Sequence, residues 1–74
     1  MALLQDELNR LAGTTQRSSQ DCANILAGTT NRTIQEALNI YAAVTDRNLS
    51  NQRALNVKAG TTDRLREDAA RLIP

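Results

Sequence analysis

Short apolar stripes with helical spacing recur along the chain. In residues 33–47, Ile34, Ala37, Leu38, Tyr41 and Ala42 stand at i, i+3, i+4, i+7 and i+8. This spacing places the five side chains on one face of an α-helix and differs from the strict alternation of a half-buried strand. The pattern predicts an all-α protein.

The stripe belongs to a unit that repeats about every 15 residues. The segment LAGTTQR at 11–17 returns as LAGTTNR at 26–32 and as KAGTTDR at 58–64, with a weaker copy, YAAVTDR, at 41–47. Two extra residues precede the last full unit, and we place them within 48–51. The units span about 4–17, 18–32, 33–47 and 48–64, and a truncated unit covers 65–74.

Helix start and stop signals flank each stripe. Thr33 with Glu36, and Ser18 with Asp21, have the spacing of an N-cap residue and its third helical residue. Glycines that suit a left-handed residue after a helix follow three of the stripes: Gly13, Gly28 and Gly60. A single short helix cannot bury its own stripe. We therefore expect one domain, an array or small bundle of about five short helices.

Each full unit also carries a glutamine followed four residues later by an asparagine. The pairs are Gln5 and Asn9, Gln20 and Asn24, Gln35 and Asn39, and Gln52 and Asn56. Residues at i and i+4 lie on one flank of a helix. We interpret the amides as structural, each asparagine bonding the loop of a neighbouring unit. The alternative is an exposed polar ladder that recognises a partner.

The composition predicts a thin core. Leu, Ile and Val together are 16 of 74 residues, and Phe and Trp are absent. A chain of this length buries only about 60% of its unfolded surface. We therefore expect the domain to gain stability from a partner.

Charge indicates neither a nucleic acid nor a membrane as partner. Nine basic and eight acidic residues give a net charge of +1. An arginine recurs in each unit, at Arg17, Arg32, Arg47 and Arg64, which suggests phosphate binding, but Asp46 and Asp63 precede two of them and only one aromatic residue is available for base stacking. We expect these arginines to cap helix ends or to pair with carboxylates. The first residues lack the pattern of a signal peptide, and no stretch has the roughly 20 apolar residues of a membrane span.

The residue types present do not favour catalysis. The chain has no His, and its glycines are spread singly, which is not the pattern of a phosphate-binding loop. The single cysteine, Cys22, occupies a slot held by Ala in other units, so we predict a buried packing residue. We assign no catalytic, cofactor-binding or metal-binding residues and expect no cofactor.

The repeat resembles one found in small structural proteins of tailed bacteriophages, particularly those infecting actinobacteria. The resemblance rests on the unit QxALNxxAGTT, with its LNxxAGTT core, which we read from Gln35 to Ala43, where it is incomplete, and from Gln52 to Thr62; it covers nearly the whole chain. In the related repeats Gly often follows Thr-Thr, where this chain has Gln16, Asn31 and Asp63. The resemblance implies a virion component and not an enzyme.

Two functions follow as expectations. The first is a non-enzymatic virion structural protein, a capsid-associated decoration or minor head protein, which docks in many copies on the phage capsid or another virion structural protein. It would be found in the virion, and in the host cytoplasm during assembly. The alternative is a tail-associated or host-surface-binding adaptor module.

The candidate partner contacts are apolar residues at the two ends of the array, where no further repeat would cover them. They are Leu3, Leu4, Leu65, Leu72 and Ile73. The other interpretation is that these residues fold back over Leu8 or Leu55 and close the array.

Overall fold

Five short helices build the protein, as the repeat predicts. The computed structural model describes residues 3–73, so Pro74, the last residue of the fifth unit, lies outside the described residues. The helices are α1 (Leu4–Ala12), α2 (Ser19–Ala27), α3 (Ile34–Tyr41), α4 (Asn51–Ala59) and α5 (Arg66–Leu72). Residues 3–73 contain no strand. The all-α prediction is confirmed.

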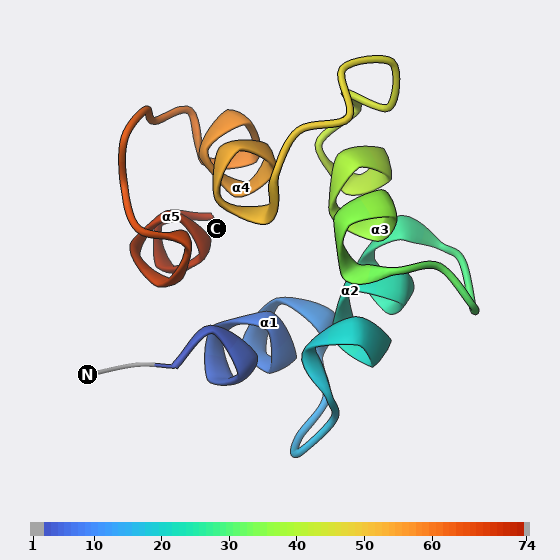
Figure 1. Cartoon of the computed structure of the whole chain (residues 1–74). Coiled ribbons are helices and arrows are strands. Elements are labelled where there is room, and N and C mark those ends of the chain that lie inside the picture. Colours follow the sequence, from blue (N-terminus) through green and yellow to red (C-terminus); the bar gives the residue numbers. More distant parts are fainter. Residues whose placement is uncertain (1–2, 74) are drawn as a thin grey trace.

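The helices follow one another around a ring that closes on itself (Figure 1). Each helix packs on the next one along the chain, and α5 packs on α1. The molecule is a flat disc with extents of 29 × 29 × 16 Å. The array therefore has no open ends, and the expectation that terminal apolar residues lie uncovered for that reason is wrong.

The predicted signals define the helix ends. At α3, the Thr33 hydroxyl accepts a hydrogen bond from the backbone N–H of Glu36, whose carboxylate accepts one from the backbone N–H of Thr33. This reciprocal pair is a capping box. Ser18 and Ser50 cap α2 and α4 through their hydroxyls. Gly13, Gly28 and Gly60 end their helices with φ between 73° and 76°, a conformation that costs glycine little.

Two consecutive positions of each helix, its fourth and fifth residues, form most of the core. They include the largest fully buried side chains, Leu8, Leu38 and Leu55, and the thiol of Cys22. The remaining core residues at these positions are alanines, namely Ala23, Ala37, Ala54, Ala69 and Ala70. Small side chains let five helices converge on the centre of a disc this thin. The prediction that Cys22 is a buried packing residue is confirmed.

The sixth residue of each of the first four helices is an asparagine that clamps the loop after its own helix. In α2, Asn24 Nδ2 donates to the carbonyls of Gln20 (2.8 Å) and Arg32 (2.9 Å). Its Oδ1 accepts from the backbone N–H of Arg32 (3.0 Å) and from the Thr29 hydroxyl (2.7 Å). Because Arg32 lies directly before the cap of α3, this clamp sets where the next helix begins.

The same clamp recurs at the other asparagines. Asn9 binds Thr14 and Arg17, and Asn56 binds Thr61 and Arg64. All four asparagines, Asn9, Asn24, Asn39 and Asn56, are buried. The asparagines are therefore structural and form no exposed ladder. The prediction that each one bonds the loop of a neighbouring unit is wrong, because each clamps the loop that follows its own helix.

The loop after α3 departs from the other three. Asn39 clamps Leu49, through its N–H (2.8 Å) and its carbonyl (2.7 Å). Leu49 therefore takes the place of Arg17, Arg32 and Arg64, a place that the sequence assigned to Arg47. The two extra residues therefore lie within 45–48, between Val44 and Leu49, and not within 48–51 as predicted. Val44 occupies the position of the threonine that donates to the asparagine in the other three units, so this hydrogen bond is missing here. Val44 and Leu49 are both buried and add apolar contacts instead.

Candidate docking surface at the closure of the ring

The contact between α1 and α5 is built around Arg10, which the sequence analysis did not single out. Arg10 Nη2 donates to the carbonyls of Ala70 and Ile73, both at 3.1 Å, near the end of α5. Its Nε donates to Glu7 Oε1 at 3.0 Å. Cations near the C-terminus of a helix are favoured because the last carbonyls lack partners within the helix. Arg10 thus closes the ring.

Glu7 is the counterpart that holds Arg10 in place. It occupies the fourth position of α1, where the other helices carry Cys22, Ala37, Ala54 and Ala69. Glu7 is buried, with only 11% of its side chain exposed. A buried carboxylate requires a charged or hydrogen-bonding partner. The sequence signal of the closure is this deviation from the repeat, a Glu at a core position where the other helices carry a small residue.

The five candidate contact residues divide into three groups. Leu3 and Leu65 are 63% and 61% exposed, and Leu72 is 46% exposed. Leu4 is partly buried against the core. Ile73 is buried, at 3% exposure, so it is a core residue and not a surface contact. The fold-back interpretation therefore holds for Leu4 and Ile73 and not for the other three.

Leu3 and Leu65 share an unusual position. Each is the N-cap of its helix, α1 and α5, and neither makes a side-chain capping hydrogen bond. The other three helices have Ser18, Thr33 and Ser50 there. We call Leu3 and Leu65 the leucine caps. Leu72, by contrast, stands at the seventh helical position, where Ile25 and Val57 are also exposed.

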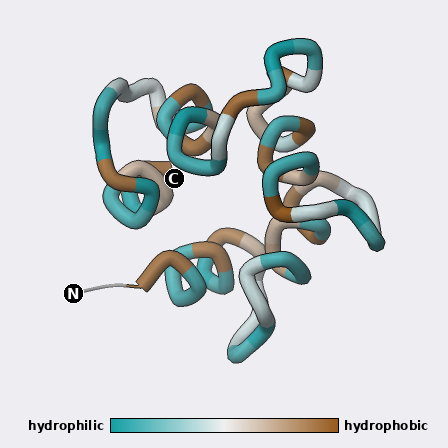
Figure 2. The backbone as a smooth tube through the Cα atoms, viewed as in Figure 1, coloured by the Kyte–Doolittle hydropathy of each residue, from teal (hydrophilic) through white to brown (hydrophobic). Residues whose placement is uncertain are grey.

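The leucine caps begin the two helices that meet at the closure. In Figure 2 the start of α1 and the start of α5 are both strongly apolar, on the left-hand edge of the disc. A cap hydrogen bond removed by substitution typically costs 0.5–2 kcal/mol. The closure therefore combines two helix starts without polar caps with two exposed leucines, which is an arrangement suited to apolar contact with a partner.

The repeated glutamines and arginines do not form a recognition row. Gln5 and Gln20 donate to the loop carbonyls of Arg17 and Arg32, and Gln35 donates to Asn48. Arg32 pairs with Glu36 at 3.7 Å, as the carboxylate-pairing prediction requires. Arg17, Arg47 and Arg64 form no ion pair within residues 3–73.

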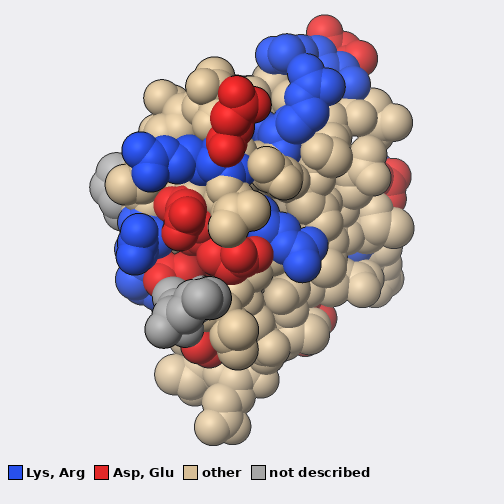
Figure 3. Space-filling view, turned by 60° about the vertical axis from the view of Figure 1, so that its left-hand side comes forward, with Lys and Arg blue, Asp and Glu red and all other residues tan. Residues whose placement is uncertain are grey.

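Charged side chains of both signs are interspersed on the side of the molecule that carries the closure (Figure 3). Ion pairs on α5 join Arg66 to Glu67 and Arg71 to Asp68. Because the two signs are mixed, this face has no extended positive electrostatic potential of the kind that attracts polyanions. The charge on this face is thus locally balanced.

The described residues offer little for other chemistry at this site. No three His, Cys, Asp or Glu side chains in residues 3–73 gather into a metal-binding group. Lys58 lies 4.7 Å from the centre of the Tyr41 ring, a cation–π distance. Partial burial raises the pKa of the Tyr41 hydroxyl, against the opposing charge of Arg10.

None of the five described helices is long and apolar enough to cross a membrane. No protein-family model matches the chain, and no curated protein and no solved structure matches it.

Proposed function

We propose that this protein is a non-enzymatic structural component of a bacteriophage virion, which docks on the capsid or another virion structural protein through its leucine caps. The observation that carries the proposal is the replacement of the polar N-cap by an exposed leucine at both helices of the closure. The LNxxAGTT repeat is the reason for placing it in a virion. Many copies of the protein would bind to one virion.

The energetics favour docking in many copies. Complete burial of a leucine side chain contributes about 1.5–3 kcal/mol, so two leucine caps give one copy only modest affinity. Association also costs several kcal/mol of translational and rotational freedom. Neighbouring copies that contact each other on a particle would add to this affinity.

Docking also compensates for the thin core. Most fully buried core side chains are alanines, and a 74-residue domain of this kind is expected to have low stability. A partner that binds only the folded state raises the melting temperature by mass action. We therefore expect the free protein to melt below the docked protein.

The test replaces each leucine cap by the residue that the repeat uses elsewhere. In Leu3→Ser and Leu65→Ser the new hydroxyl can cap α1 and α5, as Ser18 and Ser50 cap α2 and α4. We expect each variant to melt at the wild-type temperature or up to a few degrees above it. Co-sedimentation with purified phage heads and with purified tails then measures docking. Ile25→Ser, which removes an exposed apolar residue of α2, is the matched control.

We expect the wild type and Ile25→Ser to sediment with heads at a fixed ratio, and both serine variants to remain in the supernatant. Undiminished docking of Leu3→Ser and Leu65→Ser would show that the leucine caps are not the contact. Sedimentation of the wild type with tails and not with heads would indicate a tail-associated protein. Failure of the wild type to bind any particle would leave the host-surface adaptor.

A further inference from the structure

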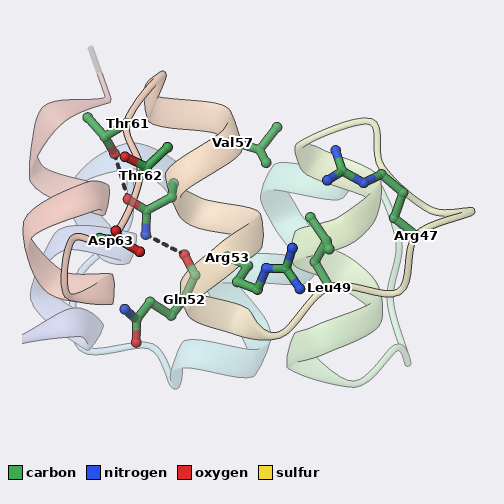
Figure 4. Close-up of a pocket in the computed structure, with 9 residues that line it drawn as sticks. Arg47, Leu49, Gln52, Arg53, Val57, Thr61, Thr62 and Asp63 are labelled. Atoms are coloured by element: carbon green, nitrogen blue, oxygen red, sulfur yellow. Dashed lines mark hydrogen bonds between the residues drawn. The ribbon is translucent and has the colours of Figure 1, made fainter.

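A groove crosses the outer face of α4, and neither leucine cap lines it. It has a volume of about 270 Å³ and runs from the loop before α4 to the loop after it (Figure 4). Arg47, Leu49, Arg53 and Val57 line one part, and Thr61, Thr62 and Asp63 line another. Gln52 and Asn56 complete the lining.

Three departures from the repeat converge on this groove. Arg53 is the third residue of α4, where the other helices carry Asp6, Asp21, Glu36 and Asp68. Arg47 comes from the loop that holds the two extra residues. The Gln52 side chain makes no hydrogen bond within residues 3–73, whereas the equivalent Gln20 and Gln35 bond their loops.

The three side chains are all hydrogen-bond donors without a partner. Neither Arg47 nor Arg53 forms a side-chain hydrogen bond or an ion pair with another described residue. Figure 4 shows both arginine side chains on the same side of α4, with the Leu49 side chain between them. Two guanidinium groups and a primary amide offer several N–H donors, which suits a carboxylate.

The corresponding groove on α3 shows what the repeat makes without these departures. It has a volume of about 300 Å³ and is lined by Arg32, Glu36, Asn39 and Ile40, among others. There the arginine of the preceding loop pairs with the acid at the third helical position, at 3.7 Å. The α3 groove is therefore neutralised from within, whereas the α4 groove has two arginines against the single carboxylate of Asp63.

The opposite part of the groove selects the kind of acidic ligand. Asp63 and the hydroxyls of Thr61 and Thr62 accept hydrogen bonds, and an extended peptide supplies backbone N–H donors for them. Asp63 also repels a ligand that is negatively charged along its whole length, such as a nucleic acid. The exposed Val57, at 40%, adds apolar contact for the stem of a glutamate side chain.

We infer that the α4 groove binds an acidic, extended peptide segment of a partner protein, with carboxylates against Arg47 and Arg53. This site is separate from the leucine caps and goes beyond the proposed function, because it gives the protein a second, electrostatic contact. Because the groove recognises the peptide by its charge, the affinity should fall as the ionic strength rises.

The experiment is an NMR titration of the ¹⁵N-labelled full chain with a capped ten-residue peptide of alternating Glu and Ala. The same peptide with Gln in place of Glu is the ligand control. We expect the acidic peptide alone to shift the Gln52 side-chain amide and the backbone amides near Val57 and Thr62. Raising the salt from 20 mM to about 500 mM should abolish these shifts, since exposed charges are screened within a few ångströms there.

The decisive variant is Arg53→Glu, which restores the acid that the repeat carries at this position and keeps α4 well capped. Reversing one charge of the pair should weaken binding about tenfold. Arg17→Gln, which removes an exposed and unpaired arginine outside the groove, should bind like the wild type. Equal binding by Arg53→Glu, shifts elsewhere than the groove, or no shifts with the wild type would overturn the inference. Inorganic phosphate producing the same shifts at equal concentration would replace the peptide by a free anion.

Discussion

The seams between successive helices and the seam that closes the ring are held by different chemistry. At each successive seam a neutral, buried asparagine binds a backbone segment eight or ten residues further on. At the closure a charged side chain, Arg10, reaches carbonyls about 60 residues away in sequence. The asparagine clamp is local, so a repeat can copy it. The closure has no following loop to clamp and requires Glu7 and Arg10, which occur once.

The difference has a thermodynamic consequence. A buried amide with all its partners satisfied contributes hydrogen bonds that are insensitive to salt. The closure relies on Arg10, whose side chain is 46% exposed, so its interactions with the carbonyls and with Glu7 are partly screened. We therefore expect the ring to be weaker at the closure than at the clamps.

The largest effect is expected from Asn24→Ala, which removes one clamp. Four hydrogen bonds are lost: the backbone N–H of Arg32 loses its acceptor, and the Arg32 carbonyl keeps only the Gln20 side chain as a donor. At about 0.5–1.5 kcal/mol for each bond, the free energy of unfolding should fall by about 3 kcal/mol, measured by urea denaturation followed by circular dichroism.

Thr29→Val is the graded control for this clamp. It removes only the hydrogen bond that the Thr29 hydroxyl donates to Asn24 Oδ1. The loop after α3 already carries a valine at the equivalent position, Val44. We expect a loss of about 1 kcal/mol. Losses of equal size for Asn24→Ala and Thr29→Val would mean that the backbone bonds of the clamp contribute nothing.

A smaller effect is expected from Arg10→Met, which opens the closure. Methionine keeps the apolar stem but leaves Glu7 buried and the end of α5 without its donor. Because Arg10 is half exposed, we expect the free energy of unfolding to fall by about 2 kcal/mol, less than the 3–5 typical of a fully buried pair. The loss should shrink at high salt, which the Asn24→Ala loss should not.

The double variant Glu7→Ala, Arg10→Met distinguishes closure from simple charge burial. Alanine is the residue of the other helices at this position, for example Ala37 and Ala54. If Arg10 acts by neutralising Glu7, the double variant recovers most of the lost stability. A double variant no more stable than Arg10→Met would assign the effect to the α5 carbonyls.

Sequence reasoning reached what each unit specifies for itself. The five helices, the caps at Ser18 and Thr33, the terminal glycines and the burial of Cys22 all follow from patterns within one unit. The ring did not follow, because closure depends on the angle between successive helices, which no local pattern encodes. The register of the loop after α3 was misassigned because the similarity of Arg47 to the other arginines outweighed the burial of Leu49.

The candidate contacts were predicted in part for the same reason. Chain position alone suggested that Leu3, Leu65 and Ile73 were uncovered, and the closure buries Ile73 while leaving the leucine caps exposed. The absence of a polar cap before α1 and α5 was visible in the sequence and is the more reliable signal. It depends on comparison between repeats and not on position in the chain.

The smallest effect contrasts the polar cap of α3 with the leucine caps. Hydrogen bonds from the backbone N–H and hydroxyl of Thr33, and then the charge of Arg32, lower the pKa of Glu36 below its ordinary 4.5. A carboxyl whose pKa is lower in the folded state stabilises the fold above its unfolded pKa, and this contribution is lost as the pH falls through the folded pKa. Wild type should therefore melt above Glu36→Gln at neutral pH, with the gap closing below about pH 4. In a Thr33→Ala background the hydroxyl donor to Glu36 is gone. The difference in melting temperature between the proteins with and without Glu36→Gln should then vary less with pH. A gap of constant size from neutral pH to pH 3 would mean that Glu36 acts in the cap by its shape and not by its charge.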